Sequence, residues 1–288
     1  MRKSTKFTRH VAYSFTPSSD ALPSNRVDIG SANDRGGELI SNTELTTDGN
    51  TTNIVLLGFI TAPIQHTTRP LRGKALSEYL APLQARGFTQ IQKDAIVGGL
   101  LGDGTLQYST KHFPFYKFDQ KAANREYVNL IYSIFNEYVG TPPTLPRKKQ
   151  GRIHSYWFRT FSLPQLNFYA RQFYEIDVLG NRKKVVPKLI NRWLNPQSLA
   201  FWFMDDGSKA TNGAYTLNTQ GFIRPDVVRL QQALGSVFNI QSNIQHHASN
   251  LEKNSVPYYI LYIPVSHAAK FKAIVEPYML NLMKYKLH

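Results

Sequence analysis

Two short stretches of the chain, residues 96–104 (IVGGLLGDG) and 199–207 (LAFWFMDDG), follow one pattern. Each is an apolar run that predicts a helix ending in an aspartate followed by glycine, so Asp103 and Asp206 are expected at equivalent helix ends. A carboxylate there lies against the negative end of the helix dipole and needs a cation or a ligand to stabilise it. Two such ends in one chain predict a metal site shared by two related halves.

Small residues indicate how the two aspartates could meet. Gly98 and Gly102 lie four residues apart on the first predicted helix, and Ala200 is the small residue of the second, so the two helices can pack closely. Close packing would bring the carboxylates together, where divalent cations offset their repulsion. Mg²⁺ suits these oxygen ligands and takes its remaining ligands from water and phosphate oxygens. The pattern therefore predicts two or more Mg²⁺ ions and hydrolysis of a phosphodiester.

The helices that carry these aspartates have clear start signals. Thr89 is a candidate N-cap for the first motif helix, with Gln92 at the capping-box position. Asn195 is a candidate N-cap for the second motif helix, with Pro196 at its first position. Both helices are therefore expected to be defined locally as well as by packing.

Hydrophobic patterning predicts the same order of elements in both halves of the chain. Strand-like runs lie at 105–109, 113–120, 153–161, 215–220 and 258–264, and helical runs at 123–138, 164–174, 225–238 and 266–279. With the motif helices included, the order is αββαββα, twice. A short helix at 76–86 is expected to precede the first motif.

Spacing supports a duplication. Asp103 and Asp206 are 103 residues apart, and Phe168 aligns with Phe271 at the same offset. Lys184 and Lys286 lie 81 and 80 residues after the aspartates of their own halves. Shared spacing with little identity predicts a monomer whose two similar halves are related by a pseudo-two-fold axis.

Charge points to the class of partner. The chain carries a formal net charge of +15, and residues 76–288, with 25 basic and 13 acidic side chains, hold most of that excess. Nucleic acid, an anionic membrane or an acidic protein would suit such a surface, and nucleic acid leads because no basic amphipathic helix or lipidation signal is evident. No apolar run is long enough to cross a membrane. The absence of cysteine excludes disulfides, Cys-ligated zinc and thiol catalysis.

The N-terminal region has a different composition. Residues 1–75 are rich in Ser, Thr, Asn, Asp and Gly, which predicts a disordered basic extension. The first nineteen residues are basic and free of acids, as in an organellar transit peptide or in a leader fused from an upstream reading frame. The expected domains are this extension at 1–75, a first half at 76–190 and a second half at 191–288.

The motif residues resemble those of a known family. IVGGLLGDG and LAFWFMDDG are similar to the paired motifs of LAGLIDADG homing endonucleases of the single-chain, two-motif type. The second half is close to the omega-intron type in this family at LNTQGF (217–222) and MKYKL (283–287). The resemblance implies an α+β, pseudo-two-fold duplicated αββαββα homing-endonuclease fold with two DNA-binding antiparallel sheets. It also implies a double-strand cut across the minor groove that leaves 3′ overhangs.

The same resemblance implies roles for individual residues. Asp103 and Asp206 would bind the metals, with the carbonyls of Gly102 and Asp205 nearby. Lys184 and Lys286 would polarise solvent or steady the transition state, Gln220 would lie near the scissile phosphate, and Lys121 would be its counterpart in the first half. The sequence departs from the family motif at Gly102 and at Asp205, where the motif has alanine.

Further basic and polar positions are candidates for binding nucleic acid. Two clusters, Arg147-Lys148-Lys149 and Arg182-Lys183-Lys184, are expected to contact phosphates. Alternating strand positions are candidate base readers, because a β-ribbon fits the major groove; these are Lys111, Lys117, Asp119, Arg159 and Thr216.

The sequence therefore predicts a monomeric, Mg²⁺-dependent, site-specific DNA endonuclease that recognises a long asymmetric site in double-stranded DNA. It is expected in an organelle, mitochondrion or chloroplast, and to be encoded there within a self-splicing intron. One alternative is a maturase that binds its own intron RNA and assists splicing, with or without DNA cleavage. Another is a transcription factor that only binds DNA. Retention of both motif acids favours the enzyme.

Overall fold

The computed structural model describes residues 71–108, 113–140, 145–247 and 258–288, and within them two similar halves follow one another. The elements of the first half are α2 Gly73–Arg86, α3 Gln90–Leu101, β1 Thr105–Tyr108, β2 Pro114–Lys121, α4 Arg125–Ile134, β3 Leu145–Lys149, β4 Arg152–Arg159 and α5 Leu166–Phe173. Those of the second half are α6 Pro196–Asp206, β7 Gly207–Lys209, β8 Tyr215–Asn218, α7 Arg224–Phe238, β9 Asn243–His247, β10 Tyr258–Ile263 and α8 Val265–Val275. The predicted order αββαββα is confirmed in both halves.

Local sequence explains where the motif helices begin. Thr89 caps α3 in a reciprocal capping box with Gln92, as predicted. Asn195 caps α6, and its reciprocal partner is Ser198, with both bonds 2.9 Å long. These bonds satisfy N–H groups that have no partner inside the helix.

Each half has a four-stranded antiparallel sheet. The strand orders are β1-β2-β4-β3 and β7-β8-β10-β9, so the two sheets have the same topology. β2 alternates between buried Tyr116 and Phe118 and the more accessible Lys117 and Asp119, which gives the sheet a core face and an outer face. The fold class, α+β with two such sheets, is confirmed.

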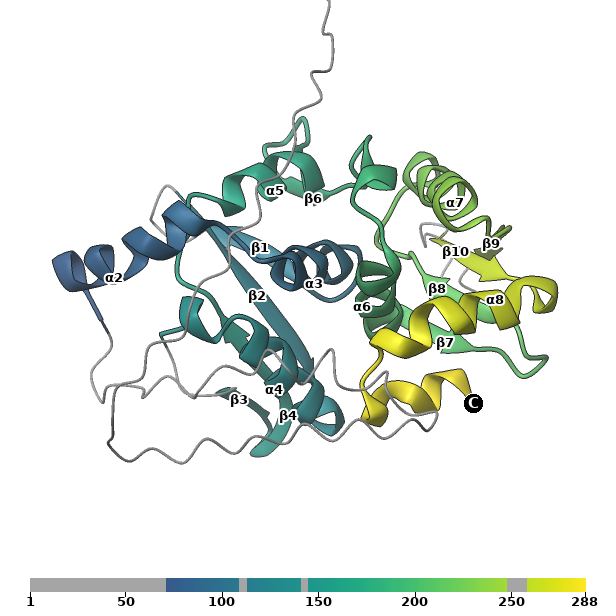
Figure 1. Cartoon of the computed structure of the whole chain (residues 1–288), viewed down its shortest axis with the longest axis horizontal. Helices are drawn as coiled ribbons and strands as arrows, with labels where there is room; N and C mark the ends of the chain where they lie inside the picture. Colours follow the sequence, from purple (N-terminus) through teal and green to yellow (C-terminus); the bar gives the residue numbers. More distant parts are fainter. Residues whose placement is uncertain (1–70, 109–112, 141–144, 248–257) are drawn as a thin grey trace, which may run out of the picture. The chain divides into compact units, whose positions relative to one another are not determined.

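The two motif helices pack against each other between the sheets (Figure 1). At Gly98 of α3 a side chain would clash with the Cβ of Phe201 and the carbonyl of Ser198, so glycine is what allows the close approach. Near the other end of the contact, Asn195 Nδ2 donates to Asp94 Oδ1 at 2.7 Å. We call this α3–α6 contact the seam.

Two further elements lie beside the seam and contact the ends of the motif helices. β5 Tyr174–Ile176 and β6 Arg182–Lys184 form a hairpin after α5, and η6, a 3₁₀ helix at Asn281–Leu287, follows α8. The sequence pattern gave no residue range for the hairpin or for the short strands β3, β7 and β9, although the predicted order implied four strands in each half. All of these strands have three to five residues, too few for an alternation to be recognised.

Helices α5 and α8 show where the difference in residue number between equivalent positions of the two halves changes. At the predicted offset of 103 residues, Phe168 would match Phe271, yet Phe168 is 53% exposed and Phe271 is fully buried. The buried residues of α5 match those of α8 at an offset of 102 instead; these pairs are Leu166 with Ala268, Tyr169 with Phe271, and Phe173 with Val275. The second half is therefore one residue shorter by this point, which also accounts for the spacing of Lys184 and Lys286.

The helix α2 begins at Gly73, three residues before the predicted start, and ends at Arg86 as expected. Of the predicted N-terminal extension, residues 1–75, the part from 1 to 70 lies outside the described residues. Within the described part of the chain, no helix has the length and apolarity that a membrane crossing requires.

Candidate active site

Both motif aspartates lie at the same end of the seam, but only Asp206 is part of its motif helix. α6 includes Asp206 as its last residue, whereas α3 ends at Leu101 and Asp103 follows the C-cap residue Gly102. Asp103 is exposed to solvent and Asp206 is half-buried. The contact between Gly102 and Asp205 brings the two helix ends together as predicted, whereas the expectation that Asp103 ends its helix is wrong.

A lysine from each half covers the C-terminal carbonyls of its motif helix. Lys184, at the end of β6, donates through Nζ to the carbonyls of Gly102 and Gly104, both at 2.9 Å. Lys286, in η6, donates to the carbonyls of Met204 at 2.6 Å and Asp205 at 3.0 Å. An ammonium group in this position complements the negative end of a helix dipole.

The charges of the four groups act on one another. Burial raises the pKa of Asp206 to about 7, the Asp103 charge adds to this rise, and Lys184 and Lys286 oppose it. Desolvation also raises the pKa of Asp103, against the effect of both lysines. Burial lowers the pKa of Lys184 and of Lys286, and the motif acids oppose that change. Because each lysine affects the acids of both halves, the four groups form one site.

Asp205 differs from the other acids. Its Oδ1 accepts a hydrogen bond from the Tyr127 hydroxyl at 2.6 Å, and its Oδ2 accepts from the backbone N–H of Asp103 at 3.1 Å. Burial, with the Asp103 charge nearby, raises the pKa of Asp205 well above its ordinary range. Its side chain therefore serves internal hydrogen bonds across the seam.

Gln120, on β2 of the first sheet, donates a hydrogen bond to the Asp103 carboxylate. Gln120 Nε2 donates to Asp103 Oδ2, and Asn124 Nδ2 donates to Gln120 Oε1 at 3.1 Å. Sequence reasoning missed Gln120 and Asn124. The available signal was Gln120 itself, a polar residue on the same alternation as buried Tyr116 and Phe118.

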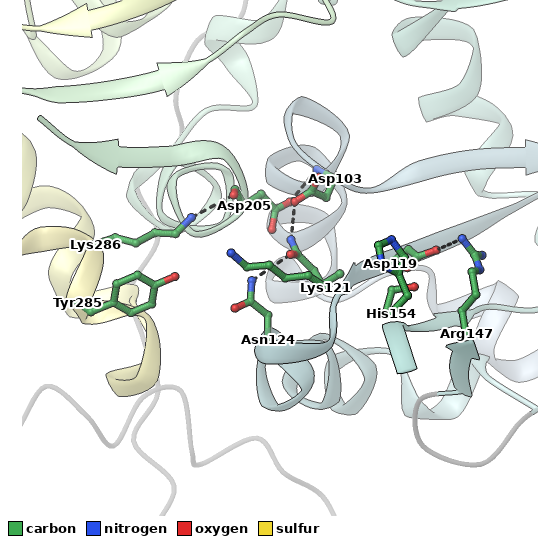
Figure 2. Close-up of a pocket in the computed structure, with 11 residues that line it drawn as sticks. Asp103, Asp119, Lys121, Asn124, Arg147, His154, Asp205, Tyr285 and Lys286 are labelled. Atoms are coloured by element: carbon green, nitrogen blue, oxygen red, sulfur yellow. Dashed lines mark hydrogen bonds and ion pairs between the residues drawn. The ribbon is translucent and has the colours of Figure 1, made fainter. Parts of the chain in front are cut away.

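A cavity of about 420 Å³ opens beside these residues (Figure 2). Its lining combines residues of the first sheet, the seam and η6; these are Asp103, Asp119, Gln120, Lys121, Asn124, Arg147, His154, Ser155, Asp205, Tyr285 and Lys286. In Figure 2, Lys121 and Lys286 extend toward the space below Asp103 and Asp205. Acidic and basic groups thus share one polar cavity that is open to solvent.

The oxygen donors fit a divalent cation in part. Among the described residues, no three His, Cys, Asp or Glu side chains are grouped so that they could hold a metal ion alone. Asp103 and Asp206 can therefore supply only part of the ligand shell, and Mg²⁺ commonly completes such shells with water and phosphate oxygens. The predicted carbonyl ligands Gly102 and Asp205 accept bonds from lysines, but each carbonyl has a second lone pair.

The strand register supports Lys121 as the counterpart of Gln220. Thr105 and Ser208, each two residues after a motif aspartate, pair with Lys117 and Thr216. Four residues further along each strand path are Lys121 and Gln220. However, Lys121 lines the cavity, whereas Gln220 is exposed in the turn after β8 and is not part of the cavity lining.

Four of the predicted nucleic-acid contacts lie together on the outer face of the first sheet. Arg147 and Lys117 both form ion pairs with Asp119, at 2.9 and 3.3 Å. Arg159 pairs with Lys117 across β2 and β4, so it lies on the same face. A register shift between Arg147 and Lys148 sets Lys148 opposite Ile153, and Lys148, as the next residue of β3, points away from the face that carries Arg147.

The remaining predicted contacts are more dispersed. Thr216 is on β8 of the second sheet, where its hydroxyl is 2.7 Å from that of Ser208. Lys183 is exposed on the β5–β6 hairpin opposite Glu175, so it is not part of either four-stranded sheet. Lys149 ends β3 opposite Arg152. Lys111 lies outside the described residues.

Comparisons with known proteins agree with this architecture. The model of the LAGLIDADG DNA endonuclease family matches residues 93–271. "Probable intron-encoded endonuclease 1" of Wickerhamomyces canadensis is 33% identical over 211 residues, which is 69% of this chain and 84% of that protein. "Cytochrome b mRNA maturase bI2" of Saccharomyces cerevisiae is 30% identical over 204 residues, 67% of this chain and 46% of that protein.

One solved structure is similar over both halves. The homing endonuclease I-WcaI bound to its DNA recognition sequence superposes with a TM-score of 0.64 and 28% identity. The match covers 77% of this chain and 95% of that one. The duplicated fold is therefore shared over nearly the whole length of that protein.

Proposed function

Because the chain belongs to the LAGLIDADG DNA endonuclease family, we propose that it is an intron-homing endonuclease that cuts both strands of a specific DNA site. The observation that carries this proposal is the pair of aspartates at the seam, Asp103 and Asp206, each accompanied by a lysine on the adjacent helix carbonyls. Two acids with two amines supply one set of groups for each strand.

In this mechanism Asp103 and Asp206 would hold Mg²⁺, with water and phosphate oxygens of the DNA as further ligands. The bound metal would activate water and stabilise the leaving oxygen. Lys184 and Lys286 contribute positive charge beside the phosphate, where charge develops in the transition state. Gln120 keeps the Asp103 carboxylate oriented from the sheet side. Lys121 and Gln220 are proposed to lie near the scissile phosphates.

The two sheets are proposed to bind the major groove on either side of the cut, and the seam to face the minor groove between them. Such a cut leaves 3′ overhangs. Since the outer faces of the sheets carry different residues, such as Asp119 with Arg147 in one and Thr216 in the other, the monomer would read a long asymmetric site. We place the protein in a mitochondrion or chloroplast, encoded within an intron there.

A second candidate function is that of a maturase that binds its own intron RNA. The similarity to the Saccharomyces cerevisiae maturase supports it. Retention of both motif acids, with their lysines in place, supports DNA cleavage as the principal activity. The two activities are compatible in one chain.

The test is incubation of the purified protein with cloned intronless alleles of organellar genes in the presence of Mg²⁺. The expected result is one double-strand break per allele at a single site, with 3′ overhangs on sequencing of the ends. Binding to that site in EDTA should weaken steeply as salt rises, because phosphate contacts release condensed counterions. An affinity that does not change with salt, or cleavage without sequence preference, would contradict the proposal.

A further inference from the structure

The backbone N–H groups of the two motif aspartates differ in the acceptors that are available to them. Asp206 is still within α6. Asp103 lies two residues beyond the end of α3, where Gly102 and Gly104 donate their N–H groups back to Gly98 and Gly99. The Asp103 N–H donates instead to Asp205 Oδ2, across the seam, at 3.1 Å. A side chain of the second half therefore holds the backbone of the first.

The absence of a side chain at Gly102 makes this contact possible. A Cβ at Gly102 would clash with the Cβ, the Cγ and the Oδ2 of Asp205. The residues that precede the two motif aspartates, Gly102 and Asp205, are therefore complementary in size. The Asp205 side chain occupies the space that a side chain at Gly102 would need. The contact cannot have a symmetric equivalent, because Gly102 has no side chain to reach Asp206.

Tyr127 holds the other oxygen of the same carboxylate. Its hydroxyl donates to Asp205 Oδ1 at 2.6 Å, from α4 of the first half. The ring is 1% exposed and packs edge-to-face on Phe118, with centroids 5.5 Å apart, so the hydroxyl has little freedom to move. Asp205 is therefore fixed at both oxygens by groups of the first half.

We propose that Tyr127 and Asp205 are positioning residues that fix the Asp103 backbone through a bridge from the Tyr127 hydroxyl to the Asp205 carboxylate to the Asp103 N–H. The bridge replaces the support that a continuing helix gives Asp206. Its loss should allow the Asp103 carboxylate to shift while Asp206 stays in place.

Under the proposed nuclease function, on which this second step rests, the two strands respond differently. Loss of the bridge changes the ratio of the two strand-cleavage rates, because only one aspartate depends on it. A general loss of stability would slow both strands together.

The first measurement needs no DNA. Amide hydrogen exchange at Asp103 is compared in the full chain and in Tyr127→Phe and Asp205→Ala variants, since alanine removes the acceptor oxygens that asparagine would partly keep. Tyr138→Phe is the matched control, since Tyr138 is also fully buried and its hydroxyl bonds the carbonyls of Leu83 and Gly87, with no group of the seam as partner. Loss of one hydrogen bond predicts up to about tenfold faster exchange at Asp103 in Asp205→Ala, a smaller increase in Tyr127→Phe, and no change in Tyr138→Phe.

The second measurement follows both strands of an end-labelled target in single-turnover cleavage. Tyr127→Phe and Asp205→Ala should slow the same strand by up to about tenfold relative to the other strand, with DNA affinity in EDTA unchanged. Because Tyr127 acts through Asp205, the double variant should be no slower than Asp205→Ala alone. Tyr138→Phe should keep the wild-type ratio.

The outcomes separate the two proposals. Unchanged exchange at Asp103 in both variants would overturn the bridge, whatever the activity. Faster exchange in a protein that cuts no DNA would support the bridge and refute the nuclease. Cleavage that keeps the wild-type strand ratio in both variants would overturn the strand-specific role.

Discussion

In the first half, Lys184 reaches the end of α3 from a β-hairpin, and in the second half, Lys286 reaches the end of α6 from a 3₁₀ helix. Both amines bond the carbonyl of the residue before the motif aspartate, Gly102 or Asp205, although the elements that carry them are unrelated. The aspartates show the reverse relation, since they come from equivalent helices but differ in support. Asp103 is held by Gln120 and Asp205, whereas the described structure gives the Asp206 carboxylate no hydrogen-bond partner.

This comparison indicates which features the two halves still share. A charged group at each helix end is common to both halves, and the means of holding it have diverged. The site is therefore symmetric in its reactive groups and asymmetric in its surroundings. Four pairs of variants test that distinction.

The largest effect is expected at the aspartates themselves. Asp103→Asn and Asp206→Asn should each lower double-strand cleavage by more than about a hundredfold, since even partners of metal ligands cost up to that factor. Both should still bind the target in EDTA. A plasmid assay measures the linear product, and normal cutting by either variant would show that the two acids do not share one site.

The lysine pair tests the symmetric part. Lys184→Met and Lys286→Met should each slow cleavage by about ten- to a hundredfold, because each removes a charged donor beside the phosphate. Nicked plasmid should accumulate, with opposite strands cut in the two variants. If both variants nick the same strand, the lysines do not act as equivalents.

The glutamines test the asymmetric part. Gln120→Leu removes the donor to the Asp103 carboxylate and should slow cleavage by up to about tenfold. Gln220→Leu changes an exposed residue outside the cavity and should have a smaller effect on single-turnover rates. Equal effects would indicate that bound DNA brings Gln220 into the site.

The smallest effects are on stability and concern the seam. Gly98→Ala forces a methyl group against Phe201 and the Ser198 carbonyl and should lower the free energy of unfolding by about 1–3 kcal/mol. Ala200→Gly, on the facing helix, should lower it by about 1 kcal/mol. Urea unfolding measures both, and a larger loss for Ala200→Gly would contradict glycine as the residue that sets the approach.

The sequence predicted those parts of the fold that local patterns define. Capping residues Thr89 and Asn195 located the motif helices, and alternation located β2, β4, β8 and β10 within a few residues. Short elements such as β3 and the β5–β6 hairpin lacked enough residues for a period. The one-residue change in offset could not be seen, because Phe168 and Phe271 are the same residue type in similar contexts.

For the site, matched spacing identified the two aspartates and the two lysines, whose geometry the structure now gives. The supporting network could not be predicted in the same way. Tyr127 and Asp205 are 78 residues apart in the chain, and Asp103 and Asp205 are 102 apart. Nothing in their local sequence connects them, and only the tertiary fold brings them together. Gln120 was within reach, as a polar residue on a buried alternation.

The complementary fit of Gly102 and Asp205 limits how such molecules can be recombined. A hybrid assembled from two first-type halves would leave an unfilled space between its central helices, and one assembled from two second-type halves would force two carboxylates into the same space. Only a first-type half joined to a second-type half satisfies both shape and charge. Exchange of modules between relatives should therefore succeed when the donor half carries the matching residue at this position.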